Sequence, residues 1–95
     1  MSTATRTVKV RMTQGLHLRP CSAIVTAAGR HRASVQIQKD GQSADAESLL
    51  ELLMLAATRD TELVVLAQGA DAQEAVQAVA ELFAGDFEEG IPAQC

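Results

Sequence analysis

An alternation of strand-like and helix-like segments is the feature that most constrains how this chain of 95 residues can fold. Residues 8–12 and 33–37 carry an apolar side chain at every second position, the period of a strand with one buried face. The Asp-Gly pair at 40–41 predicts a hairpin turn into a short strand over 42–46. Residues 63–66 are all apolar, which predicts a strand that is central in its sheet or covered.

Helical signals separate these strands. Residues 20–28 are rich in alanine and are followed by Gly29, a residue that commonly ends a helix. Ser48 and Glu51 have the spacing of a capping box, in which the serine oxygen accepts a backbone N–H and the glutamate reaches back to the N–H of the serine. A second helix is therefore predicted over residues 48–57.

A third helix completes the order β-α-β-β-α-β-α. Asp71 and Glu74 repeat the capping-box spacing, and apolar residues recur on one helix face until Gly85. The order predicts an α+β open-faced β-sandwich, a four-stranded antiparallel sheet with three helices on one face. We expect a single domain over residues 1–89 and a loosely held C-terminal tail over residues 90–95.

The amino-acid composition limits the classes of partner that this chain can bind. Only Phe83 and Phe87 are aromatic, so the core must be built from aliphatic side chains. Residues 1–39 contain seven basic residues and no acidic one, whereas all twelve acidic residues lie in 40–95, and the net charge is −4. Without aromatic residues among the basic ones, this balance disfavours nucleic acid. It suits a single phosphoryl group or an acidic protein surface.

The two cysteines and the lengths of the apolar runs indicate the cellular compartment in which the protein acts. Cys95 is the last residue, an unfavourable place for a disulfide partner of Cys21, so we expect free thiols in a reducing, cytoplasmic setting. The apolar runs are too short for membrane insertion. We expect Cys21 to be a small buried side chain, or else an oxidisable thiol at a helix N-terminus. His31 is expected on the surface, and no residue spacing predicts a metal site.

The chemistry is concentrated in the segment Gly15-Leu16-His17-Leu18-Arg19-Pro20. A histidine at a helix start faces backbone N–H groups that lack an intrahelical acceptor and the positive end of the helix dipole. A phosphoryl group on the imidazole would meet those donors and the guanidinium of Arg19. An imidazole titrates near neutrality, so it can accept such a group and release it again. The alternative is a loop histidine beside a surface arginine.

The motif Gly15-Leu16-His17-x-Arg19-Pro20 resembles the active-site motif of the HPr family, and Ser48 falls where that family has a regulatory serine. The resemblance runs from about Arg6 to Glu89. It implies a phosphocarrier of the phosphoenolpyruvate-dependent phosphotransferase system, which takes a phosphoryl group from enzyme I onto the imidazole Nδ1 and passes it to an EIIA domain. His17 would be the acceptor and Arg19 its electrostatic partner, with Gly15 and Leu18 also beside the phosphoryl group.

The resemblance further implies a phosphoryl carrier rather than a free-standing catalyst, with no bound cofactor and no metal. We expect a monomer. A serine kinase/phosphorylase modifies the matching serine in many members, yet Ser48 is equally well explained as a helix cap. Glu47 and Glu51 would also repel a phosphate at Ser48.

The second predicted helix is apolar almost all round, so part of it should remain exposed. The side chains expected in the core are Leu52, Leu55 and Ala56. Those expected in an exposed patch are Leu49, Leu50 and Leu53. An exposed apolar patch is typical of a partner-binding surface, and the family docks its partners in this region. The alternatives are a self-association face or a helix that is buried more deeply.

Two other functions stay open. An HPr-like regulatory interaction module would act through Ser48 and the leucines of the second helix, independently of His17. A domain that binds small molecules is disfavoured, because no sequence feature marks a pocket.

Overall fold

The structure is a computed structural model that describes residues 2–11 and 15–84. Four expectations fall outside those residues: a first strand reaching Met12, a helix stop at Gly85, a domain end at residue 89 and a tail over 90–95. The elements follow one another in the predicted order. They are β1 (Ser2–Lys9), α1 (Leu18–Gly29), β2 (Ala33–Lys39), β3 (Gln42–Asp45), α2 (Leu49–Met54), β4 (Glu62–Gly69) and α3 (Ala72–Ala84).

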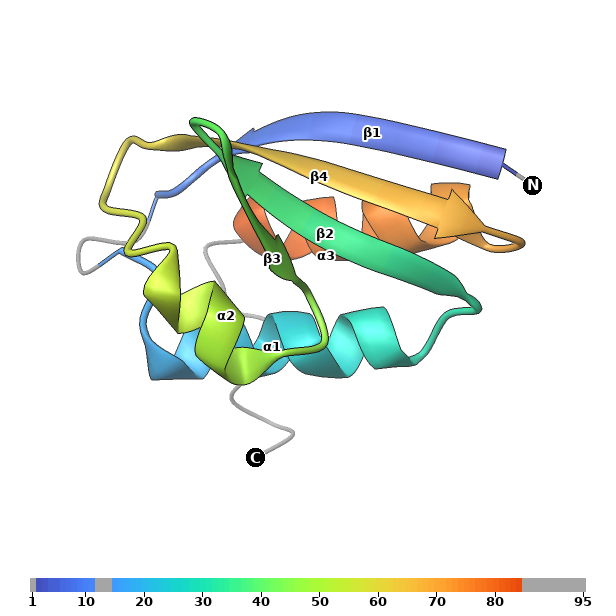
Figure 1. The fold of residues 1–95 in the computed structure, drawn as a ribbon, viewed down its shortest axis with the longest axis horizontal. Helices are drawn as coiled ribbons and strands as arrows, with labels where there is room; N and C mark the ends of the chain where they lie inside the picture. The colour runs from blue at the N-terminus through green and yellow to red at the C-terminus, as the bar shows by residue number, and fades with distance from the viewer. Residues whose placement is uncertain (1, 12–14, 85–95) are drawn as a thin grey trace.

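The four strands form one antiparallel sheet in the order β1-β4-β2-β3, with β4 between β1 and β2 (Figure 1). Val8 of β1 pairs with Leu63 of β4, and Val65 of β4 pairs with Ile37 of β2. Because side chains alternate between the faces of a strand, these apolar residues share one side of the sheet. The predicted antiparallel sheet and the central position of residues 63–66 are confirmed.

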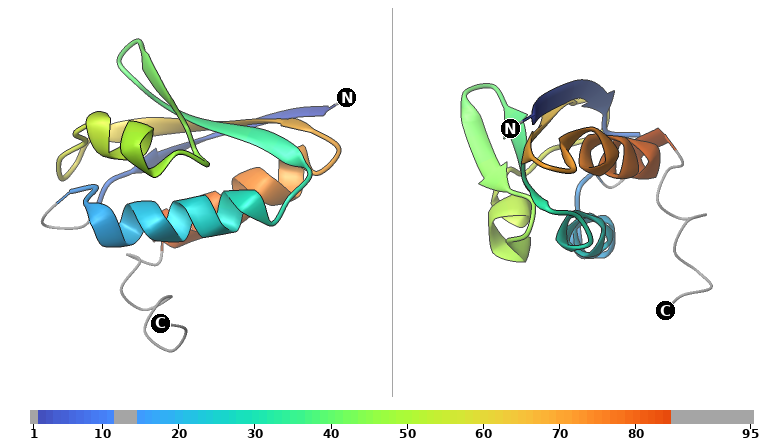
Figure 2. Two further views of the ribbon diagram at one scale, coloured as in Figure 1. Left: turned by 60° about the horizontal axis from the view of Figure 1, so that its bottom comes forward. Right: turned by 90° about the vertical axis from the view of Figure 1, so that its right-hand side faces the viewer.

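All three helices lie on that apolar side of the sheet (Figure 2). Helix α3 packs on β1, β4 and β2, and α1 lies beside α3. The short α2 packs against β3 and α1. The predicted α+β open-faced β-sandwich is therefore confirmed.

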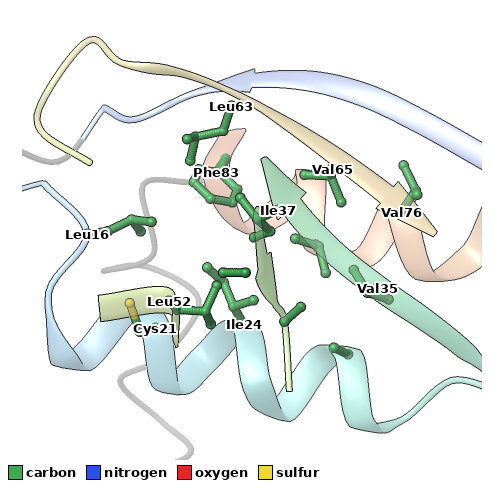
Figure 3. Close-up of a cluster of buried hydrophobic side chains, with 14 of the residues drawn as sticks. Leu16, Cys21, Ile24, Val35, Ile37, Leu52, Leu63, Val65, Val76 and Phe83 are labelled. Carbon is green, nitrogen blue, oxygen red and sulfur yellow. The ribbon is translucent and has the colours of Figure 1, made fainter. Parts of the chain in front are cut away.

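The core between sheet and helices is aliphatic apart from Phe83 (Figure 3). The largest fully buried side chains are Phe83, Ile24, Ile37, Leu52, Leu63, Val10, Val35, Val65, Val79, Pro20 and Cys21. Leu16 and Cys21, from the start of α1, enter the same cluster as Leu52 of α2 (Figure 3). Leu16, which immediately precedes His17, is thus fixed by the core itself.

Two elements differ in length from the prediction. β1 extends back to Ser2, because β4 supplies hydrogen-bonding partners along its whole length although its outer residues are exposed. α2 ends at Met54 and not near residue 57, because the backbone of Ala56 turns to a φ of +52°. Ala56 is exposed, so the expectation that it belongs to the core is wrong.

Candidate functional site

His17 caps the N-terminus of α1. Its backbone is extended, with φ −118° and ψ −169°, and its carbonyl oxygen accepts the first helical hydrogen bond, from the Cys21 N–H at 3.1 Å. The side chain makes no capping hydrogen bond and is half-buried, so the imidazole keeps access to solvent. The predicted position of His17 at the helix start is confirmed.

The backbone before His17 is fixed by a contact with the segment that follows α2. The Leu16 N–H donates to the Ala57 carbonyl oxygen at 2.9 Å. Gly15 has a φ of +75°, and a Cβ on it would lie 2.5 Å from the same oxygen. Only glycine combines this backbone conformation with so close an approach. Gly15 therefore shapes the loop that presents His17.

Hydrogen-bond donors are available at the start of α1. Leu18 and Arg19 are its first two residues, and in the described part of the chain their N–H groups have no acceptor. Pro20, the third residue, has no N–H to leave unsatisfied, and it is buried. The Arg19 side chain is exposed and pairs with no carboxylate among residues 2–11 and 15–84. Two amides and a guanidinium thus remain free to bind an anion beside the imidazole.

Ser48 caps α2. Its Oγ accepts the Glu51 N–H at 3.2 Å, which is the first half of the predicted capping box. The second half is wrong: the Glu51 carboxylate accepts the Asp45 N–H at 2.8 Å, while the Ser48 N–H donates to the Asp45 carbonyl oxygen at 2.9 Å. The Ser48 N–H already has an acceptor in the Asp45 carbonyl oxygen, and the Glu51 carboxylate binds the Asp45 amide instead.

The second predicted capping box, formed by Asp71 and Glu74, also differs from what the structure shows. The Asp71 carboxylate accepts the Arg32 N–H at 3.1 Å, so it joins the start of α3 to the loop before β2. Helix α3 still begins at this point, since the Asp71 carbonyl oxygen accepts the Ala75 N–H at 2.8 Å. The Asp71 carboxylate oxygen that could have capped α3 locally accepts a hydrogen bond from the distant Arg32 amide instead.

The exposed apolar side chains lie partly elsewhere than predicted. Leu18, Leu50 and Met54 are 59%, 67% and 71% exposed. Leu49 and Leu53, expected in an exposed patch with Leu50, are half-buried and pack against the core. The reason is the orientation of the short α2 about its axis, which places Leu50 and Met54, four residues apart, on the solvent-exposed face. That spacing is present in the sequence, so Met54 could have been identified there.

Cys21 is a buried thiol in the first turn of α1. Its side chain is fully buried, and burial raises the pKa of the thiol from 9.0 to about 11. The first interpretation, a small buried side chain, therefore holds over an oxidisable thiol. His31 is half-buried rather than fully on the surface, and its Nδ1 lies 3.0 Å from the Ala27 carbonyl oxygen at the end of α1.

Within residues 2–11 and 15–84, no group of three or more histidine, cysteine or acidic side chains could hold a metal ion. No helix within these residues is long and apolar enough to cross a bilayer. A pocket of about 230 Å³ lies between β1 and α3, lined in part by Arg6, Arg11 and Phe83, and includes neither His17 nor Ser48.

Comparison with known proteins decides the family. A family profile described as "PTS HPr component phosphorylation site" matches residues 4–85. The chain belongs to the HPr family. The HPr-like protein Crh of Bacillus subtilis is 40% identical over 73 residues, which cover 77% of this chain and 86% of Crh.

Solved HPr-family structures share the fold. The phosphocarrier protein HPr from Bacillus anthracis matches with a TM-score of 0.81 at 30% identity, over 87% of this chain and 99% of that one. Crh from Bacillus subtilis, described as an intertwined dimer with a swapped domain, matches with a TM-score of 0.71 at 37% identity, over 83% and 91% of the two chains. The HPr family therefore includes both phosphocarriers and HPr-like proteins.

Proposed function

We propose that this HPr-family chain is a phosphocarrier in which His17 accepts a phosphoryl group from enzyme I and passes it to an EIIA domain. The Nδ1 lone pair of His17 attacks phosphorus, the N–P bond on the donor protein breaks, and a new N–P bond forms on His17. Attack by an EIIA histidine reverses these roles. The group moves from nitrogen to nitrogen without any change of oxidation state.

The observation that carries this proposal is the position of His17 as the N-cap of α1. The phosphoryl oxygens would accept from the N–H groups of Leu18 and Arg19, while the Arg19 guanidinium offers a charged donor. Gly15 contributes by its backbone conformation, which lets the loop approach Ala57. Partial burial restricts the ring without closing it off from a second protein.

The test is labelling with enzyme I and radioactive phosphoenolpyruvate. We expect acid-labile, base-stable label on the wild type and none on His17→Ala. His31→Ala is the matched control, since it removes the other histidine, which contacts the end of the same helix. Equal labelling of wild type and His17→Ala would refute the proposal.

The partner proteins would dock on the helices that His17 and Ser48 cap. Leu18 on α1 and Leu50 and Met54 on α2 are the exposed large apolar side chains among the described residues. Exposed apolar surface on a small domain is characteristic of binding surfaces. The carrier would act as a cytoplasmic monomer, a prediction that sedimentation at the labelling concentration tests.

A second function, that of a regulatory interaction module, is favoured by the 40% identity to HPr-like protein Crh. Such a module would act through a phosphate placed on Ser48 by a serine kinase/phosphorylase and through the apolar side chains of α2. It predicts that Ser48→Ala abolishes activity in the cell, whereas His17→Ala leaves activity unchanged. The phosphocarrier predicts the opposite pair of results.

A further inference from the structure

Lys39 connects the sheet to the end of α2. It is the last residue of β2, and its side chain is half-buried. The Nζ atom donates to the Leu55 carbonyl oxygen at 2.7 Å and lies 3.5 Å from that of Ala56. These carbonyls follow the end of a helix, where backbone oxygens lack intrahelical donors and a positive charge is stabilising.

The carbonyl next along the chain is the one that holds the loop before His17. Ala56 adopts a φ of +52°, an unfavourable conformation for alanine that needs support from its surroundings. Immediately afterwards, the Ala57 oxygen accepts the Leu16 N–H at 2.9 Å and lies against Gly15. Lys39 therefore holds Leu55 and Ala56, the two residues that determine where the Ala57 carbonyl oxygen points.

We propose that Lys39 is a positioning residue for phosphoryl transfer at His17, acting through residues 55–57 and Leu16. The inference rests on the phosphocarrier function proposed above. The links are a hydrogen bond from Lys39 to Leu55, two peptide bonds from Leu55 through Ala56 to Ala57, a hydrogen bond between Ala57 and Leu16, and one peptide bond from Leu16 to His17. In this proposal Lys39 acts through the backbone and not by contact with the phosphoryl group.

The far end of the same loop is held independently of Lys39. The Asp60 N–H donates to the Val10 carbonyl oxygen at 2.7 Å, and the Val10 N–H donates to the Thr61 carbonyl oxygen at 2.9 Å. Leu55 and Ala57 are buried as well. Loss of the Lys39 ammonium should consequently loosen residues 55–57 locally while the domain stays folded.

The variant is Lys39→Met, which keeps the aliphatic stem and removes the donor. Lys9→Met is the matched control, because Lys9 is the exposed last residue of β1 and its ammonium makes no hydrogen bond within the described chain. Lys39→Arg should restore function, since it keeps a cationic donor. Lys39→Gln is a second loss variant. The glutamine side chain is too short to reach the Leu55 carbonyl oxygen, but it keeps a polar residue beside the hairpin turn.

Two measurements are made on each protein. Amide hydrogen exchange reports the Leu16 N–H, and we expect it to be about tenfold faster in Lys39→Met and in Lys39→Gln. Kinetics of His17 phosphorylation by enzyme I should show a several-fold lower kcat with an unchanged KM, because the docking helices keep their exposed side chains. Lys9→Met and Lys39→Arg should match the wild type in both.

The inference is overturned if Leu16 exchange and kcat are unchanged in the loss variants, or if KM alone rises. It is also overturned if Lys39→Arg fails to restore kcat. Failure of the phosphocarrier function itself has a different signature, which is absence of label on the wild type.

Discussion

Replacing Gly15 by alanine tests whether the loop before His17 is set by its contact with Ala57. Two separate penalties act on Gly15→Ala. The φ of +75° lies in the left-handed region, which an L side chain disfavours, and the new Cβ would lie 2.5 Å from the Ala57 oxygen and 3.1 Å from the Thr58 Cα. Both neighbours are backbone atoms, so neither can rotate away as a side chain could.

The magnitude follows from adding the two penalties. A left-handed conformation costs alanine about 1–2 kcal/mol relative to glycine. Forcing an extra carbon into a well-packed site adds about 1–3 kcal/mol, because the backbone must shift. We therefore expect Gly15→Ala to lower the free energy of unfolding by roughly 2–5 kcal/mol, a large share of the stability of a small domain.

Gly41 provides a control that separates the two penalties. Its φ of +85° is equally left-handed, yet a Cβ there would meet nothing within 4 Å. Gly41→Ala should therefore lose only about 1–2 kcal/mol in urea unfolding, with an unchanged m-value. Gly29→Ala, which has neither penalty and lies at the end of α1, should be neutral or slightly stabilising.

The reasoning is refuted if Gly15→Ala and Gly41→Ala lose the same stability. That result would mean that Ala57 yields without penalty and does not fix the loop. In the folded fraction of Gly15→Ala we also expect slower phosphorylation of His17, since the Leu16 N–H must separate from Ala57. Gly41→Ala should be phosphorylated at the wild-type rate, because the hairpin turn lies outside this chain of contacts.

Three further changes test the core, the thiol and the cap. Leu52→Ala should lower the free energy of unfolding by about 2–5 kcal/mol, whereas Leu50→Ala, at an exposed site, should change it by less than about 0.5 kcal/mol and weaken enzyme I binding in a titration. Burial holds the pKa of the Cys21 thiol at about 11 against 9.0, so between those values the unfolded chain binds fewer protons. The free energy of unfolding should therefore fall with rising pH from 9 to 11, by at most about 1.4 kcal/mol per pH unit, and Cys21→Ala should remove that component. Ser48→Ala should lose about 1 kcal/mol in urea unfolding, and equal stability would contradict the observed cap.

The parts of the fold that the sequence predicted are those governed by neighbours in the chain. The Asp-Gly turn is one case: Asp40 and Gly41 have φ of 47° and 85°, the pair of left-handed conformations that a tight hairpin requires. Ser48 is another, because a serine oxygen reaches an amide three residues on by local geometry alone. The start of α1 at His17 follows equally from Gly15 and Pro20.

What the sequence could not supply are hydrogen-bond partners that lie outside the helix turn a capping box joins. Glu51 reaches Asp45 and Asp71 reaches Arg32, in place of the local amides that a capping box offers. Lys39 meets Leu55 only because the end of β2 arrives beside the end of α2. No periodicity encodes such meetings, since they depend on how sheet and helices are placed in space.

A phosphoryl group would meet opposite surroundings at the two helix starts. Beside His17, the N–H groups of Leu18 and Arg19 have no acceptor among residues 2–11 and 15–84, and the Arg19 side chain is exposed. Beside Ser48, the carboxylate of Glu51 is held on the amide of Asp45, and the side chain of Asp45 in turn accepts the Glu47 N–H at 2.9 Å. A dianion on Ser48 would therefore gain the helix dipole of a six-residue helix but face the fixed carboxylates of Glu51 and Asp45. These surroundings support the proposed role of His17 as the residue that carries the phosphoryl group, because its helix start offers donors where that of Ser48 offers carboxylates.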